Sequence, residues 1–277
     1  MDNLAIIIVF YNPSFDQIEQ AALLARNNMV IVVDNSCKYN YVAENPKFCY
    51  IPLYQNYGIA YAQNIGIREA KNNNAKFILF QDQDSSLSEE QIGQLYNEYL
   101  LIQRKDPCIG ALGPVIMNRE TGKAYKNELG DSITGLVSTV ISSGMLVETK
   151  TLENVGLMEE DLFIDNVDHE WCWRAQKKGY NIYMTSKSLL YHSVGIDTKR
   201  FWSIQIIKSS PVRSYYKFRN NISLIQRKYV PFLWKVKAIG TMLLEYLKYI
   251  VCWKEYGAEY IKYATRGILN LKLGNIK

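Results

Sequence analysis

The stretch that decides the fold is Lys76-Phe-Ile-Leu-Phe-Gln-Asp-Gln-Asp-Ser85. Its apolar run, residues 77–80, predicts a buried β-strand. Asp82 and Asp84 follow, and residues two apart in an extended chain point to the same side. Two such carboxylates favour a site for a hard divalent cation that also holds a phosphate-bearing ligand. Because open α/β sheets bind ligands outside the carboxyl ends of their strands, we expect the functional site here.

Apolar runs alternate with helical patterns on both sides of this stretch. Strands are predicted over residues 4–10, 29–33, 48–53, 76–80, 108–117, 140–148, 182–184 and 188–191. Helices are predicted over residues 14–27, 58–71, 88–104 and 168–178, and from residue 211 onward. The polar, glycine-containing residues 118–139 predict a loop or hairpin over the site. This alternation indicates an α/β fold with a mainly parallel central sheet flanked by helices.

The length of 277 residues suits one large domain with an appendage. We expect a nucleotide-sugar-binding catalytic domain over residues 1–210 and a helical region over residues 211–277. The five cysteines are scattered without a CxxC pair, which favours reduced thiols in a reducing compartment. The sequence shows neither the layout of a signal peptide nor a run of 18 uncharged apolar residues, so no membrane span is predicted.

The net charge of +5 is unevenly distributed. Residues 1–200 hold 18 Lys+Arg and 24 Asp+Glu, a net of −6, whereas residues 201–277 hold 14 Lys+Arg and 3 Asp+Glu, a net of +11. The second segment also holds 14 of the 35 aromatic residues. Its amphipathic helices are explained either by core packing or oligomerisation, or by docking on an anionic membrane surface.

A second acidic cluster lies in Phe163-Ile-Asp-Asn-Val-Asp-His-Glu-Trp-Cys-Trp-Arg174. Asp168 and Glu170 fall in the first turn of a predicted helix, where carboxylates also serve as caps. A carboxylate that faces the metal site from a helix N-terminus can instead deprotonate an acceptor hydroxyl. Asp82 and Asp84 taken alone also fit a polar turn, but the two clusters together favour a catalytic site.

Residues suited to a nucleotide follow the first two predicted strands and open the second helix: Phe10, Tyr11, Asn12, Asp34, Asn35, Asn56, Gly58, Ala60 and Asn64. Aromatic rings stack on bases, Asp accepts hydrogen bonds from a base or ribose, and small residues let a ligand approach closely. Neither GxGxxG nor GxxxxGK[ST] occurs, so neither a dinucleotide fingerprint nor a P-loop is supported. His192 follows a short predicted strand, and an imidazole there is either structural or a ligand for a metal such as Mn²⁺.

Together these stretches resemble family 2 inverting glycosyltransferases, which have the A-type nucleotide-sugar-binding fold. The resemblance covers about residues 4–230 and rests on motifs in sequence order: Val9-Phe-Tyr-Asn12, Val33-Asp-Asn-Ser36, Asn56-x-Gly-Ile-Ala60 with Asn64 and Gly66, Gln81-Asp-Gln-Asp-Ser85, Ser143-Gly144, Asp168-x-Glu170 with Arg174, and His192. It is closest to bacterial rhamnosyltransferases of O-antigen and capsule assembly. The pointers are the Gln81–Ser85 motif, Phe163-Ile-Asp-x-x-Asp-x-Glu-Trp171 and Pro211-x-Arg-x-Tyr-Tyr-x-x-Arg-Asn220, followed by the basic tail.

The resemblance implies metal-dependent inverting transfer of L-rhamnose from dTDP-L-rhamnose to a lipid-linked surface glycan, in the cytoplasm at the inner face of the bacterial membrane. It implies that Asp34 contacts the base or ribose, and that Asp84 ligates Mg²⁺ or Mn²⁺ with His192. Asp82 would contact the ribose or help to hold the metal. Gln83 and Gly144 would also belong to the donor site.

The resemblance further implies that Asp168 is the base and that Glu170 and Arg174 orient acceptor or donor. Val167 stands where many members carry Glu, so Asp165 remains a rival for the base. Neighbouring members use UDP-sugars with similar motifs, which leaves the donor open.

Three other classes fit less well. A haloacid dehalogenase phosphatase carries its Asp-x-Asp after the first strand, whereas this pair follows the fourth predicted strand. A nucleotidyltransferase has a glycine-rich N-terminal loop that is absent here. A non-enzymatic basic protein that binds membranes or nucleic acid would explain the tail but not the acidic clusters.

Overall fold

The computed structural model describes residues 3–38, 46–85, 87–119, 121–125, 128–192, 198–201, 204–207, 210–251 and 257–270; for residues 192, 198–201 and 204–207 it describes the backbone alone. Ten strands are found in these residues: β1 (Leu4–Phe10), β2 (Met29–Asp34), β3 (Phe48–Pro52), β4 (Phe77–Asp82), β5 (Ile109–Asn118), β6 (Thr134–Leu136), β7 (Leu146–Glu148), β8 (Asn181–His192), β9 (Thr198–Phe201) and β10 (Ile204–Ile207). The helices are α1 (Phe15–Leu24), α2 (Ile59–Asn72), α3 (Glu89–Lys105), α4 (Thr149–Val155), the 3₁₀ turn η1 (Glu160–Leu162), α5 (Val167–Lys177), α6 (Pro211–Ile225), α7 (Phe232–Val251) and α8 (Ala258–Leu269).

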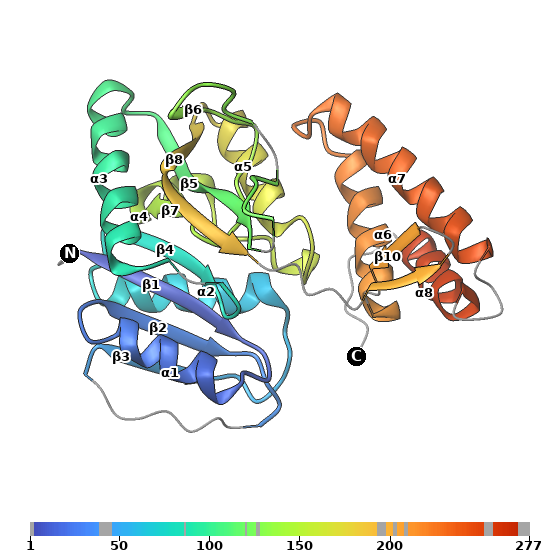
Figure 1. The fold of residues 1–277 in the computed structure, drawn as a ribbon, viewed down its shortest axis with the longest axis horizontal. Coiled ribbons are helices and arrows are strands. Elements are labelled where there is room, and N and C mark those ends of the chain that lie inside the picture. Colours follow the sequence, from blue (N-terminus) through green and yellow to red (C-terminus); the bar gives the residue numbers. More distant parts are fainter. Residues whose placement is uncertain are drawn as a thin grey trace.

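The central sheet has eight strands in the order β3-β2-β1-β4-β7-β5-β8-β6 (Figure 1). β1 pairs in parallel with both β2 and β4, and β5 pairs in parallel with β8. β6 and β7 are antiparallel to their neighbours. The prediction of an α/β fold with a mainly parallel sheet is confirmed. Because the chain passes from β1 outward to β3 and then returns to β4, the order switches between β1 and β4, where such sheets bind ligands.

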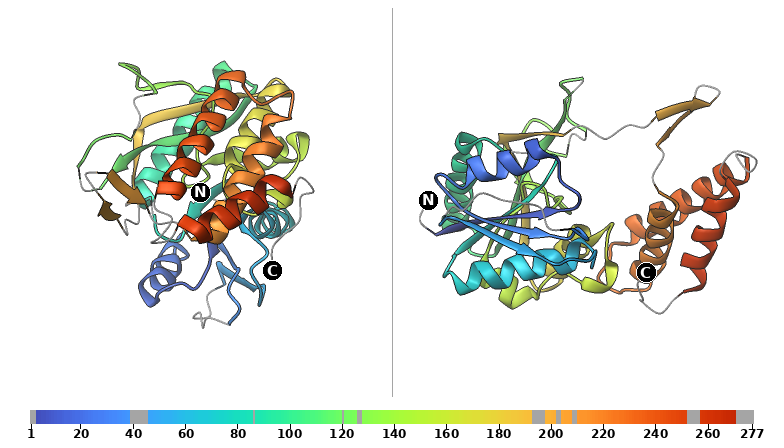
Figure 2. Two further views of the ribbon diagram at one scale, coloured as in Figure 1. Left: turned by 90° about the vertical axis from the view of Figure 1, so that its right-hand side faces the viewer. Right: turned by 90° about the horizontal axis from the view of Figure 1, so that it is seen from below.

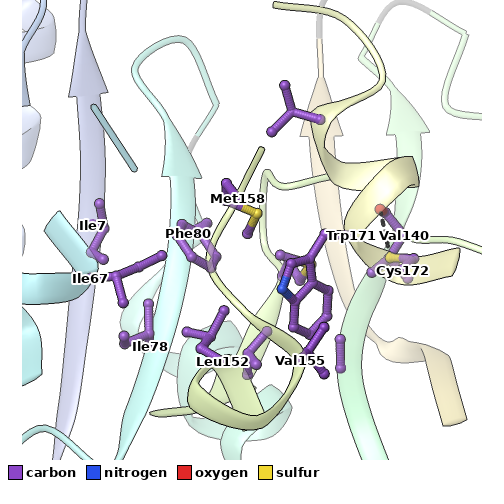
Figure 3. Close-up of a cluster of buried hydrophobic side chains, with 14 of the residues drawn as sticks. Ile7, Ile67, Ile78, Phe80, Val140, Leu152, Val155, Met158, Trp171 and Cys172 are labelled. Atoms are coloured by element: carbon purple, nitrogen blue, oxygen red, sulfur yellow. Dashed lines mark hydrogen bonds between the residues drawn. The ribbon is translucent and has the colours of Figure 1, made fainter. Parts of the chain in front are cut away.

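Apolar clusters cover both faces of the sheet, as a parallel sheet requires. Along β1, Ile6 belongs to one cluster and Ile7 to the other, because successive side chains alternate between the faces. Figure 3 shows Ile7 and Ile78 of the sheet in the cluster that also contains Ile67 of α2 and Trp171 of α5. The sheet and these two helices thus form one packed support for the strand ends.

Local helix signals were predicted correctly. Ser14 and Ser88 each form a capping box with the glutamine three residues later, which begins α1 and α3 where the sequence indicated. α5 ends at Lys177 and Gly179 has a φ of +88°, the left-handed conformation that suits glycine after a helix. These boundaries depend on residues within one turn of each other.

Two strand predictions need correction. Only Leu146–Glu148 of the predicted strand 140–148 is extended, because Gly144 has a φ of +82° and its N–H donates to the Phe80 carbonyl across the sheet. The predicted strands 182–184 and 188–191 are one strand, β8, with a register shift against Pro114 and Val115 of β5. α4 was not predicted.

Helices α6, α7 and α8 form a group beside the α/β unit (Figures 1 and 2). Gly267 of α8 packs closely on α6, since a Cβ there would lie 2.5 Å from the Tyr215 carbonyl oxygen. In the described part of the chain, no helix is both long enough and apolar enough to cross a membrane.

Candidate active site

A cavity of about 1120 Å³ lies at the carboxyl ends of β1 and β4. Val9 and Asp82 are paired across these two strands and both line the cavity. α5 contributes Asp168 to the lining, α6 contributes Lys217, and α7 contributes Lys237. The cavity therefore extends from the switch point of the sheet to the C-terminal helices, with Asp168 on its wall.

Three carboxylates gather on the sheet side of this cavity: Asp82, Asp84 and Asp168. Burial, together with the negative charges of Asp84 and Asp168, raises the pKa of Asp82 to about 7. The cluster therefore lacks positive charge. Binding a cation there would relieve this repulsion.

The residues at the end of β4 fit a divalent cation that is shared with a ligand. No group of three His, Cys, Asp or Glu side chains in the described residues is arranged to hold a metal by itself. Mg²⁺ is commonly held by one or two carboxylates together with substrate phosphates, and Asp82 and Asp84 supply that number. The side chain of His192, at the end of β8, lies outside the described residues, so its part in metal binding stays a prediction.

The loop that carries the two aspartates is fixed by side chains on both sides. The Asp82 N–H donates to the Ser143 hydroxyl at 3.4 Å, and the Ser85 and Ser143 hydroxyls are hydrogen-bonded to each other. Gln83 joins the ends of β4 and β1, because its Oε1 accepts from the Tyr11 N–H at 2.7 Å and its Nε2 donates to the Tyr11 carbonyl at 3.3 Å. The carboxylates are therefore held on a prearranged loop.

The expected nucleotide side of the cavity is lined by Tyr11, Asn35, Asn56 and Gly58. The amides of Asn35 and Asn56 are hydrogen-bonded to each other at 2.9 Å. Asn56 also accepts from the Gly58 N–H, and Gly58 has a φ of +91° with no room for a Cβ against Phe163. The Tyr11 side chain is about half exposed, at 49%, so its ring is accessible to a base.

Nine of the predicted site residues line the cavity: Tyr11, Asn35, Asn56, Gly58, Asp82, Gln83, Asp84, Asp165 and Asp168. Eight others are not among the lining residues: Phe10, Asn12, Asp34, Ala60, Asn64, Gly144, Glu170 and Arg174.

The structure gives these eight residues other surroundings. Phe10 is fully buried in the core, so the prediction that its ring stacks on a base is corrected. Ala60 is equally buried, and Gly144 packs against Pro114. Asn64 is hydrogen-bonded to the backbone of Met158 through both its amide groups.

Asp34 and Asn12 belong to a hydrogen-bond network at the ends of β1 and β2. The buried Asp34 carboxylate accepts hydrogen bonds from the Tyr50 hydroxyl and the Ser36 N–H. The Ser36 hydroxyl in turn accepts from the Asn12 N–H at 2.7 Å.

The three rivals for the base have different surroundings. Asp165 pairs with Arg213, whose Nη2 lies 2.7 Å from Oδ1. Glu170 is fully buried and accepts from Arg174 at 2.9 Å and from the Tyr229 hydroxyl at 2.6 Å. Asp168 forms no ion pair with any described residue, and its Oδ2 accepts from the Ser142 N–H at 3.1 Å. Of the three, only Asp168 both lines the cavity and has no ion-pair partner among the described residues.

Glu170 and Arg174 do not line the cavity and join α5 to neighbouring segments. Arg174 also donates to the carbonyls of Val155 and Leu157, and Arg227 reaches both Glu159 and Glu170. Burial alone would lower the pKa of Arg174, but its hydrogen bonds to Glu170 and the charge of that residue raise it. The pKa of Tyr229 is raised to about 12 by burial and by Glu170. Neither residue is among those that line the cavity, so the prediction that they orient acceptor or donor stays a prediction.

The loop before α5 is strained. Phe163, Asp165 and Asn166 all have φ near +64°, a conformation that residues other than glycine rarely adopt. α6 holds this loop: Asn220 Nδ2 lies 2.9 Å from the Leu162 carbonyl, 2.6 Å from that of Ile164 and 3.1 Å from that of Asp165. The ring of Phe163 is also stacked on Tyr216 at 4.4 Å. Two motifs that lie far apart in the sequence are therefore one structural unit.

Replacing Asn220 with Ala should release this loop and shift Asp168. Because a displacement of about 1 Å at a reacting group can cost about 10²-fold, we expect kcat to fall by one to two orders of magnitude with little change in nucleotide affinity. Steady-state kinetics and calorimetric titration separate the two effects. Asn181→Ala is the control, since this residue also donates to a partner, Asp106, but at the opposite end of the strands. An equal fall in kcat for both variants would contradict the positioning role.

Several lining residues were missed by sequence reasoning: Gln63, Ser142, Trp173, Lys217, Trp234 and Lys237. Arg213 was quoted only as part of a motif. No short pattern marks these residues, because they reach the cavity through the packing of α5, α6 and α7. The lysines belong to the basic tail, which was the one signal that pointed to them.

Comparison with known proteins identifies the family. The family model described as Glycosyl transferase family 2 matches residues 5–139. The dTDP-rhamnosyl transferase RfbF of Shigella flexneri is 34% identical over 278 residues, which cover 94% of this chain and 92% of the relative. The chain belongs to glycosyltransferase family 2. It is therefore an enzyme that transfers a sugar.

Other similarities agree with this family. The low-salt glycan biosynthesis hexosyltransferase Agl10 of Haloferax volcanii is 25% identical over 244 residues, which cover 79% of this chain and 74% of the relative. The crystal structure of GalNAc-T7 with UDP, GalNAc and Mn²⁺ aligns with a TM-score of 0.58 and 13% identity, over 82% of this chain. This chain spans about half, 48%, of that structure's length. At this identity the likeness shows the fold alone, and it confirms the predicted A-type fold.

Proposed function

We propose that this glycosyltransferase moves L-rhamnose from dTDP-L-rhamnose to a hydroxyl of a bacterial surface glycan and inverts the anomeric carbon. The donor is supported by the 34% identity to a dTDP-rhamnosyl transferase over 94% of the chain. The observation that carries the mechanism is the cavity in which Asp168, free of any ion pair with the described residues, lies on one wall with Asp82 and Asp84.

In this proposal, Asp168 takes the proton from the acceptor hydroxyl as its oxygen attacks C1 of the sugar. The bond between C1 and the diphosphate oxygen breaks, and its electron pair stays with the departing dTDP. The Ser142 N–H orients the carboxylate through Oδ2. Because the attack comes from the face opposite the leaving group, the product is inverted in one displacement through an oxocarbenium-like transition state.

Asp82 and Asp84 would hold Mg²⁺ or Mn²⁺ at the donor diphosphate, with His192 as a further proposed ligand. When bound, such a cation supplies positive charge that stabilises the departing diphosphate. Tyr11, Asn35 and Asn56 would bind the nucleoside, since they line the cavity beside the aspartates. Asp165 is not proposed as the base, because Arg213 offsets its charge.

Calorimetric titration with dTDP and UDP tests the donor and the metal together. We expect dTDP to bind more tightly than UDP in Mn²⁺, and EDTA to weaken dTDP binding by about tenfold or more, since a carboxylate cluster repels a diphosphate unless a cation joins them. Asp84→Asn in Mn²⁺ should resemble the unchanged protein in EDTA. Tighter binding of UDP would replace rhamnose by a UDP-sugar, and dTDP binding that is insensitive to EDTA would overturn the metal assignment.

A further inference from the structure

A second, smaller cavity of about 220 Å³ adjoins the main cavity near the end of β5. Its walls come from β5, from residues 139–143, from α5 and from β8. Glu128, Thr139 and His169 line both cavities, so the two share a wall. None of the three carboxylates that gather in the main cavity lines the smaller one. The smaller cavity is therefore a separate space beside the proposed reaction centre.

Most of the lining that the smaller cavity does not share is apolar. Five of its lining residues carry side chains without a hydrogen-bonding group: Pro114, Ile116, Val140, Ile141 and Met184. The Val140 carbonyl accepts from the Cys172 thiol of α5 at 3.7 Å, which ties this wall to the helix (Figure 3). The carboxyl and imidazole groups of the lining, from Glu128 and His169, belong to the shared wall. A ligand group that enters beyond this wall should itself be apolar.

The smaller cavity borders the turn that connects the two sides of the reaction centre. Ser143 lines it, and the hydroxyl of this residue accepts from the Asp82 N–H at 3.4 Å. The neighbouring Ser142 N–H donates to Asp168, and His169 follows Asp168 directly. In the proposed reaction, C1 of the transferred sugar lies between the diphosphate at Asp82 and the base Asp168. The sugar ring must then lie at this turn, with the smaller cavity beside it.

The chemistry of the walls indicates which ring substituent they accept. Ordinary hexoses carry a hydroxymethyl group at C5, whereas 6-deoxyhexoses carry a methyl group there. The Ser143 hydroxyl is already bonded to Ser85 and to the Asp82 N–H, and Tyr125 is 40% exposed. A hydroxyl placed among the apolar side chains would lose its hydrogen bonds to water without gaining a partner, while a methyl group is stabilised by leaving water.

We propose that the smaller cavity holds the C6 methyl group of a 6-deoxyhexosyl donor and thereby selects such donors over their 6-hydroxy counterparts. Ile116 of β5 and Met184 of β8 are its specificity-determining residues. This inference rests on the proposed function, because the position of C1 between Asp82 and Asp168 places the ring. It adds a physical basis for donor choice that is independent of the nucleotide.

Two nucleotide-sugars that differ only by the C6 hydroxyl, dTDP-L-rhamnose and dTDP-L-mannose, test the proposal. Calorimetric titration of the full chain in Mn²⁺ should show about 10- to 100-fold tighter binding of dTDP-L-rhamnose, the range in which an apolar pocket rejects an added hydroxyl. Met184→Gln and Ile116→Thr each place a hydrogen-bonding group in the cavity. Either change should reduce this preference by about threefold or more, because the C6 hydroxyl gains a partner.

Val115→Thr is the matched control. Val115 precedes Ile116 on β5 and lines neither cavity, so the same kind of substitution should leave the preference between the two donors unchanged. Titration of each variant with dTDP alone shows whether the nucleotide site is intact. We expect the dTDP affinity of all three variants to equal that of the unchanged protein, because the cavity contacts the sugar and not the nucleotide.

The outcomes separate this proposal from the proposed reaction. If the unchanged protein binds both nucleotide-sugars equally, or if the preference survives both Met184→Gln and Ile116→Thr, the methyl assignment is overturned while the rhamnose donor stands. Lower turnover with an unchanged donor preference in these variants would overturn it too, and would assign the cavity to the acceptor. If neither dTDP nor dTDP-L-rhamnose binds, the proposed reaction fails and the methyl assignment fails with it.

Discussion

An Asp168→Asn enzyme should turn over about 10² to 10⁴ times more slowly than the unchanged protein, because the carboxylate proposed to take the acceptor proton is lost. Asparagine has nearly the same shape and can still accept from the Ser142 N–H. Nucleotide binding should therefore change little. Release of dTDP measures kcat, and calorimetric titration with dTDP measures the affinity in the same preparation.

Asp165→Asn is the matched control for this experiment. Its carboxylate also lines the cavity, but it is paired with Arg213, whose side chain is 54% exposed. Removing the charge frees Arg213 without removing a base, so we expect a smaller loss of kcat than for Asp168→Asn. If Asp165→Asn is the more damaging change, the two aspartates have exchanged roles. Normal turnover by Asp168→Asn would reject it as the base.

Features encoded by neighbouring residues could be predicted from the sequence. The apolar run of β4 with Asp82 and Asp84 at its end pointed to the edge of the sheet where the cavity lies, and the helices predicted from residues 14 and 88 begin there. Parallel pairing followed from the alternation of strands and helices. In each case the deciding interactions lie within one or two turns or along one strand.

Features that depend on tertiary packing could not be predicted. Nothing near Asp165 in the sequence indicates that Arg213, 48 residues later, offsets its charge. The first part of the strand predicted over residues 140–148 is replaced by a turn, because Ser143 and Gly144 bond to the end of β4 instead of continuing a ladder. The resemblance placed Asp168 and Glu170 in one catalytic group, yet on α5 they face opposite surroundings, since residues two apart on a helix do not share a face.

Because Glu170 is buried, its replacement is expected to cause the largest loss of stability. Its side chain is fully buried, and it holds Arg174 in a bidentate pair while also accepting from Tyr229. Glu170→Ala leaves the largely buried Arg174, whose side chain is 21% exposed, without its main partner, and breaking a buried pair costs about 3–5 kcal/mol. Denaturant titration of both proteins measures the difference in the free energy of unfolding.

Glu153→Ala is the control for this change, because the Glu153–Lys71 pair is about half exposed, at 46% and 61%. Exposed pairs contribute about 0–1 kcal/mol, so this variant should unfold nearly as the unchanged protein does. Glu170→Ala with unchanged stability and lost turnover would restore the orienting role that the resemblance implied. A large loss of stability, with dTDP affinity retained below the unfolding transition, would instead show that Glu170 supports α5 while Asp168, two residues earlier, faces the substrate.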